Sequence, residues 1–332
     1  MEPPPPALTI AIPTIGRLAL FREALASALS QTVPVDVVAS DNGSSDGTQA
    51  YLAALVPAGN LRIFRHGATM PVQDHGAFIL SQIRTDWVVF LSDDDRLEPG
   101  FSAAILDAIS QRPEVALVYT GCNMTYADVI VAAKTGPDVE SAASFFFEFM
   151  NGRRNVCMCA TAFRTRDWRS IGRQPDNCLI GDMYYWIRIL LRGGNIGCIE
   201  AHLATYSFYR RGVRTETSRI SPLTWHRETW GYAGEMARFL ATSDEFANRQ
   251  KDIERARAKF VALTTANQLI WSALRGASKV EIARSLMSLA GALVKDRRAM
   301  TRSLAALILP SAVLNAVLTI AARRRSAEKA AA

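Results

Sequence analysis

Three consecutive carboxylates follow an apolar run in the first third of the chain. The stretch Trp87–Leu91 is typical of a buried strand, and the acidic run Ser92–Asp95 comes directly after it. Adjacent carboxylates repel one another and are costly to remove from water, so a fold that places them here is expected to offset their charge with a cation. A solvated acidic turn that caps the helix after Pro99 is the alternative.

A second polar turn precedes the acidic run. It spans Ser40–Thr48 and follows the strand-like stretch Val35–Ala39, while the first apolar stretch, Leu8–Ile12, ends at Pro13-Thr14. In parallel α/β sheets, ligands bind beyond the carboxyl ends of the strands. The three turns are therefore expected to meet in one crevice, as in a nucleotide site with a metal beside it.

The elements that position these turns alternate between short apolar runs and longer amphipathic stretches. Further strands are expected at 61–64, 115–119, 156–163 and 196–199, and helices at 18–29, 48–55, 74–83, 99–110, 140–150 and 183–191. This alternation predicts a doubly wound α/β fold with a mainly parallel sheet covered by helices. From Pro222 onward the pattern is almost entirely helical, so we expect two regions, 7–219 and 220–332, with a boundary near Arg219.

Composition limits the function classes. The 332 residues are 49% hydrophobic, and the net charge of +7 comes from the tail, where residues 275–332 hold 11 Lys/Arg against 3 Asp/Glu. The front region is close to neutral, so nucleic-acid binding is not expected. The five cysteines are odd in number and lack C-x-x-C spacing, and residues 1–6 show no secretory signal, so we expect buried thiols and a cytoplasmic protein.

Four motifs in order identify a resemblance. They are Ile12-Pro13-Thr14, SDNGSSDGT (40–48), FLSDDDRLEP (90–99) and GDMYYWIRILLRGG (181–194). Over about residues 7–210 the chain resembles a family 2 glycosyltransferase of the GT-A fold. The resemblance implies a hexosyl-type transfer from a nucleotide-sugar donor to an acceptor hydroxyl, usually with inversion, assisted by Mg2+ or Mn2+.

The resemblance also assigns the donor side of the site. Pro13, Thr14 and Arg17 lie where the family contacts the nucleobase and ribose. Asp41 matches the acid that accepts a hydrogen bond from the donor's base, with Asn42 beside it in the turn. The alternative for Asp41 is a cap of the turn that follows it.

The acidic run corresponds to the family's DxD-type motif, with one departure. Alignment on Pro99 puts Ser92 at the first acid, so Asp93 is expected to supply the ribose-side contact. Asp94 and Asp95 are the expected metal ligands, with Asp94 the better candidate.

Asp182 is the candidate general base, because the family carries an acidic pair before the matching helix and only its second acid is present here. An N-cap for that helix is the alternative. Asp74 is a candidate donor contact or a helix cap. Arg210 and Arg211 are candidates for clamping the donor's diphosphate, with a solvated basic loop as the alternative.

The tail holds a mostly apolar stretch, Ser303–Ala322, interrupted by Pro310 and followed by three arginines. Its polar residues recur on one face, which favours a helix at a membrane interface over one that spans the bilayer or packs on protein. A second amphipathic segment, 279–298, agrees with this because its apolar residues stand among Lys and Arg. We therefore expect a peripheral protein on the inner face of the plasma membrane that acts on a glycan or lipid-linked acceptor in surface polysaccharide synthesis.

Two other function classes compete. A nucleotidyltransferase shares a doubly wound core and acidic metal residues, but it normally needs a Gly-rich phosphate loop after the first strand, and residues 12–17 contain only Gly16. A non-catalytic nucleotide-sugar binder is the other alternative, because each acidic motif lacks its first acid.

Overall fold

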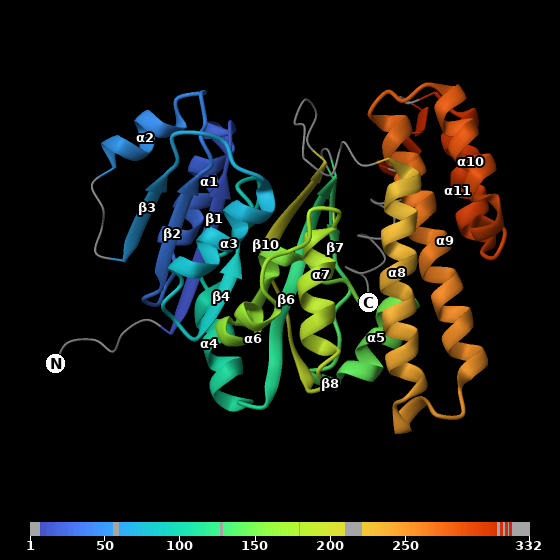
Figure 1. Cartoon of the computed structure of the whole chain (residues 1–332), viewed down its shortest axis with the longest axis horizontal. Coiled ribbons are helices and arrows are strands. Elements are labelled where there is room, and N and C mark those ends of the chain that lie inside the picture. Colours follow the sequence, from blue (N-terminus) through green and yellow to red (C-terminus); the bar gives the residue numbers. More distant parts are fainter. Residues whose placement is uncertain are drawn as a thin grey trace.

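The computed structural model describes residues 7–55, 60–126, 129–178, 180–209 and 221–310, together with residues 313, 314, 316, 317, 319 and 320. One sheet with strand order β3-β2-β1-β4-β9-β6-β10-β5 forms the centre, and helices flank it. A bundle of C-terminal helices stands beside the sheet (Figure 1). The predicted α/β fold with a helical C-terminal extension is confirmed.

The N-terminal half supplies the parallel part of the sheet. Strand β1 pairs in parallel with β2 and β4, and β2 pairs in parallel with β3. These strands alternate with helices, as the sequence predicts. The elements are β1 Leu8–Thr14, α1 Leu18–Leu29, β2 Asp36–Asp41, α2 Thr48–Ala54, β3 Leu61–Arg65, α3 Val72–Gln82 and β4 Trp87–Phe90.

The second half of the sheet is mixed. Strand β9 lies antiparallel between β4 and β6, whereas β6 and β10 run parallel. Strands β5, β7 and β8 join antiparallel to β10, β6 and β10, respectively. The elements are β5 Arg96–Leu97, α4 Phe101–Gln111, β6 Val115–Tyr126, β7 Val129–Ala132, β8 Val139–Ser141, α5 Ala142–Met150, η1 Met158–Ala160, β9 Thr161–Arg164, α6 Thr165–Ile171, α7 Gly181–Leu190 and β10 Asn195–Tyr209.

Some expected boundaries in this half are wrong. The strand expected at 156–163 is a 3-10 turn followed by β9, and the one expected at 196–199 is the much longer β10. The helix expected from residue 140 begins at Ala142 because Glu140 belongs to β8. The helix expected from residue 183 begins at Gly181, which places Asp182 inside its first turn.

Helices cover both faces of the sheet. Alternate β1 side chains point to opposite faces, so Ile10 packs in a core with Phe21 of α1 and Phe101 of α4, whereas Ala11 packs with Ile79 of α3 and Trp186 of α7. Both faces are buried, which explains why these strands are apolar throughout.

Aromatic side chains of α5 join the C-terminal helices to the sheet. Phe146 lies 5.5 Å from Phe239 between ring centroids, and Phe149 lies 5.2 Å from Phe260. Helices α8 and α9 thus share a core with the sheet, while the expected boundary residue, Arg219, lies outside the described residues. The helices are α8 Pro222–Ala241, α9 Gln250–Leu274, α10 Lys279–Leu293 and α11 Arg297–Ile308, with a 3-10 turn, η3, at Asp244–Phe246.

The tail is interrupted where the sequence predicts. Helix α11 ends at Ile308, two residues before Pro310, which cannot donate the next helical hydrogen bond. Among the described residues, no helix combines the length and apolar character needed to cross a bilayer. The five cysteines are free and buried.

Candidate active site

The turns after β1 and β2 are bonded to each other. The Asn42 amide donates to the carbonyl of Thr14 at 2.9 Å, and the Gly16 amide donates to Ser44 Oγ at 2.7 Å. Asp46 accepts from the amide of Leu18 at 2.8 Å. Two segments almost 30 residues apart in sequence therefore form one rigid rim at the carboxyl edge of the sheet, as predicted.

Asp41 ends β2 and is fully buried. It accepts hydrogen bonds from the amide of Ser44, at 3.1 Å, and from the Ser44 hydroxyl. The Asn42 side chain both accepts from and donates to the Met70 backbone at 3.0 Å, so it fastens the loop before α3. Asp41 thus makes the hydrogen bonds of a residue that caps the turn after it, which is the alternative to a donor contact. It also lies at the carboxyl edge of the sheet, where the sequence predicts the nucleotide site.

Asp93 is held by two groups from β1 and its turn. Thr14 Oγ1 donates to Asp93 Oδ2 at 2.7 Å, and the Arg17 guanidinium pairs with Asp93 at 2.5 Å. Burial raises the pKa of Asp93 to about 6, against the opposing charge of Arg17 and the Thr14 hydrogen bond. Of the predicted donor-side residues, Thr14 and Arg17 therefore both contact Asp93, and Pro13 lies next to them at the end of β1.

Asp94 and Asp95 have different surroundings. Asp94 keeps 12% of its side chain exposed, and its Oδ2 lies 3.1 Å from Arg17. Asp95 is buried and accepts a 2.8 Å hydrogen bond from the amide of Ser207 in β10. Burial, reinforced by the neighbouring Asp94 charge, raises the pKa of Asp95 well above its usual range. The acidic turn is thus tied to the second half of the sheet.

The acidic run can supply part of a metal site. A hard divalent cation is commonly held by one or two carboxylates together with substrate phosphates. Asp94 fits this role because its carboxylate reaches the surface, whereas Asp95 already binds the backbone. In the described part of the chain, no group of three or more His, Cys, Asp or Glu residues forms a complete ligand set. The residues therefore fit a cation only if the donor's phosphates complete its coordination.

Asp182 lies in the first turn of α7. Its Oδ1 accepts a 2.8 Å hydrogen bond from the amide of Met183. Two residues earlier, the amide of Ile180 donates a hydrogen bond to the Glu228 carboxylate of α8. The Asp182 side chain is exposed, yet desolvation by the surrounding protein raises its pKa, opposed by the Met183 amide. A raised pKa makes it a better base.

Tyr206 links the acidic run to Asp182. Burial raises the pKa of the Tyr206 phenol, and the charges of Asp95 and Asp182 raise it further, so both carboxylates lie within electrostatic reach of this ring. The sequence does not assign Tyr206 or the Ser207 amide to the site. The only signal is their position just before the Arg210-Arg211 pair, because a backbone contact to Asp95 leaves no trace in residue type.

One further candidate does not join this cluster. Asp74 is about half exposed in the first turn of α3 and forms an ion pair with Arg173, which also binds Asp176. Its charge is therefore already paired on the surface. Arg210 and Arg211 lie outside the described residues.

Comparison with known proteins agrees with this geometry. Residues 9–174 of the 332, half of the chain, match the family described as glycosyl transferase family 2. The chain belongs to this family. It is therefore a glycosyltransferase, and the matched span contains the rim and the acidic run.

Solved structures share the fold. The structure of S. aureus TarS 1–349 in complex with UDP-GlcNAc has a TM-score of 0.60 at 13% identity and covers 90% of this chain and 89% of that chain. The mannosyltransferase PcManGT from Pyrobaculum calidifontis, in complex with GDP-Man and Mn2+, has a TM-score of 0.53 at 17% identity. The match covers 95% of this chain and 87% of that chain. At these identities the likeness concerns the fold alone. No curated protein matches the sequence.

Proposed function

We propose that this enzyme transfers a sugar, with inversion, from a nucleoside diphosphate sugar to a hydroxyl of a glycan or lipid-linked acceptor in surface polysaccharide synthesis. In this proposal Asp94 would hold a Mg2+ or Mn2+ ion that assists the transfer. The observation that carries the proposal is the convergence of Thr14, Arg17, Asp93 and Asp94 at one sheet edge, where Asp95 binds the Ser207 amide.

Different residues of the chain carry out the separate steps of donor binding and proton transfer. The rim that carries Asp41 and Asn42 presents polar groups to the nucleoside, and the buried Asp93 holds Thr14 and Arg17 in place beside it instead of contacting the ribose itself. Asp182 takes the proton from the acceptor hydroxyl as that oxygen attacks the anomeric carbon. When bound at Asp94, a divalent cation supplies charge stabilisation for the leaving diphosphate. Donors bound by the structural neighbours, UDP-GlcNAc and GDP-Man, support this donor class.

The first experiment is thermal stabilisation by UDP, GDP, dTDP and CDP, each with and without Mn2+. We expect a rise in Tm with one nucleotide that is larger with Mn2+, because a ligand stabilises the folded state that it binds. No rise with any nucleotide would favour a site that forms only with its acceptor.

Two variants separate catalysis from binding. Asp94→Ala should abolish the metal-dependent part of the rise in Tm as well as transfer. Asp182→Asn should abolish transfer and keep the rise. If Asp182→Asn retains transfer, the protein has another base, and if wild type binds donor with no transfer to any acceptor, the non-catalytic alternative stands.

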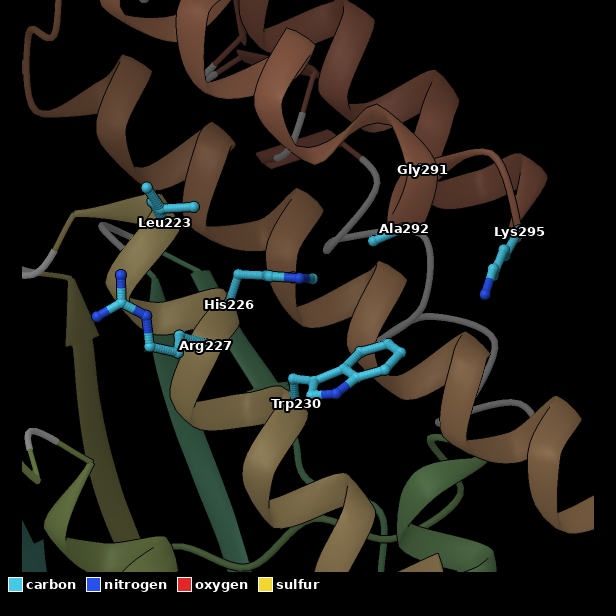
Figure 2. Close-up of a pocket in the computed structure, with 7 residues that line it drawn as sticks. All are labelled: Leu223, His226, Arg227, Trp230, Gly291, Ala292 and Lys295. Carbon is cyan, nitrogen blue, oxygen red and sulfur yellow. The ribbon is translucent and has the colours of Figure 1, made fainter.

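The C-terminal helices supply the surface for a membrane. Ten of the fourteen large apolar side chains exposed among the described residues belong to 221–320, including Met287 and Val294, which are 71% and 64% exposed. A hollow of about 420 Å3 lies between α8 and α10. Figure 2 shows exposed Trp230 facing the end of α10 near Lys295. Among the residues that the structure describes, the lining of the hollow contains Arg227, His226 and Lys295 and no acid. Apolar and basic side chains together favour an anionic lipid surface.

The membrane proposal has its own test. Met287→Ser with Val294→Ser should reduce binding to liposomes that contain anionic lipid, whereas Val72→Ser, an equally exposed valine of α3, should not. Equal binding by both variants would contradict the assignment of this surface while leaving the transfer chemistry intact.

A further inference from the structure

Arg17 bridges two carboxylates of the acidic run. Its guanidinium lies 2.5 Å from Asp93 Oδ1 and 3.1 Å from Asp94 Oδ2, and its Nε donates to Asp93 Oδ2 at 3.2 Å. The sequence assigns Arg17 to the donor's nucleobase and ribose, but the structure turns it toward the acids. It lies directly before α1, in the turn fixed by the bonds to Ser44 and Asp46.

This contact answers the charge problem of the acidic run. Asp93 is fully buried, and a buried carboxylate is stable only with a partner charge or several hydrogen bonds. Arg17 supplies that charge, and Thr14 adds a hydrogen bond. Asp95 is turned away toward Ser207, so the positive charge is shared between the other two acids.

The contacts of Arg17 are unequal. Two of them hold Asp93, whose carboxylate is inaccessible, and one holds Asp94, which reaches the surface. The contact to Asp94 can therefore break while the pairing with Asp93 remains. Arg17 therefore contacts the same Asp94 carboxylate that a divalent cation would need as a ligand.

We propose that Arg17 is a built-in counter-ion that competes with the divalent cation for Asp94 and so sets the metal affinity of the enzyme. The inference rests on the proposed metal-assisted transfer and goes beyond it, because it assigns a residue that opposes metal binding in the absence of donor. Weak binding of the metal alone, strengthened by the donor's diphosphate, follows from this arrangement. Like charges beside one carboxylate disfavour each other's binding.

The experiment is calorimetric titration of the full chain with Mn2+ alone. Arg17→Gln removes the competing charge, so we expect its affinity for Mn2+ to exceed that of wild type by at least about tenfold. Arg17→Lys keeps a positive charge and should stay near wild type. Arg96→Gln is the matched control. It also removes one positive charge next to the acidic run, but this charge belongs to a surface ion pair with Glu23. It should change the affinity less than threefold.

The outcomes separate this inference from the proposed function. If Asp94→Asn abolishes Mn2+ binding while Arg17→Gln leaves it unchanged or weaker, the metal site stands and the competition is refuted. If Asp94→Asn binds Mn2+ as wild type does, the metal site itself is wrong, and the inference falls with it. Circular dichroism checks that Arg17→Gln folds, and if it does not, tighter binding by Arg17→Met is the deciding result. Absence of binding by every variant that lacks Arg17 also overturns the inference.

Discussion

His75 makes the stability of this enzyme depend on pH. It lies on α3, is only 3% exposed, and places Nε2 2.8 Å from Ser40 Oγ, one residue before Asp41. Burial, together with the neighbouring His66, lowers the pKa of His75 from 6.5 to about 4, and the Asp41 charge opposes part of this change. The imidazole is therefore neutral in the folded protein at neutral pH.

The direction of the effect follows from proton binding. Between pH 6.5 and about 4 the unfolded chain binds a proton at His75 that the folded chain does not, so acidification favours the unfolded state. The stabilisation is complete above pH 6.5 and is lost as the pH falls towards 4. The difference between the two pKa values corresponds to about 3 kcal/mol of unfolding free energy.

His75→Gln tests this reasoning. Glutamine is neutral at every pH and retains a hydrogen-bonding group for Ser40. Urea denaturation at pH 7.5 and pH 4.5 should show a loss of unfolding free energy in wild type that exceeds the loss in His75→Gln by about 2–3 kcal/mol. Parallel pH profiles for wild type and His75→Gln would refute the assignment.

Three further predictions concern the site and its support. Asp182→Asn should lower kcat about 100- to 10,000-fold while the nucleotide Kd stays within threefold, whereas equal loss of both would make the residue structural. Gly43→Ala should lower the unfolding free energy by about 1–3 kcal/mol more than Gly16→Ala. Both glycines have positive φ (+79° and +62°), but only a Cβ at Gly43 would meet backbone, at 2.7 Å from the carbonyl carbon of residue 68. Phe146→Ala should cost about 3–5 kcal/mol in denaturation, since its ring is fully buried against Phe239, and an unchanged midpoint would contradict the shared core.

The parallel half of the fold is predictable because each element carries its own local signal. Apolar runs such as Leu8–Ile12 and Trp87–Leu91 are buried on both faces, and polar turns mark their ends. The antiparallel β9 is not predictable in the same way. Its place between β4 and β6 depends on pairing with residues up to 77 positions away, and nothing within Thr161–Arg164 encodes that choice. The length of β10 cannot be predicted from its local sequence for the same reason.

The site shows the same division between local and long-range information. That Asp41 and the acidic run lie at strand ends follows from local pattern, and the structure brings them to one edge. The partner of each acid does not follow, because Arg17 meets Asp93 across 76 residues and Ser207 meets Asp95 across 112. The latter contact uses a backbone amide, which any residue type supplies.

The acidic run is best understood as three carboxylates with three different surroundings. Three equivalent charges in a row would repel one another at the end of a buried strand. The fold instead pairs Asp93 with Arg17, ties Asp95 to the β10 backbone, and leaves Asp94 nearest to solvent. Asp93 and Asp95 thereby join the two halves of the sheet at the crevice, and Asp94 is left to bind a ligand. The loss of an acid at Ser92 is compatible with function for this reason, since the acids that remain already divide the structural and chemical roles between them.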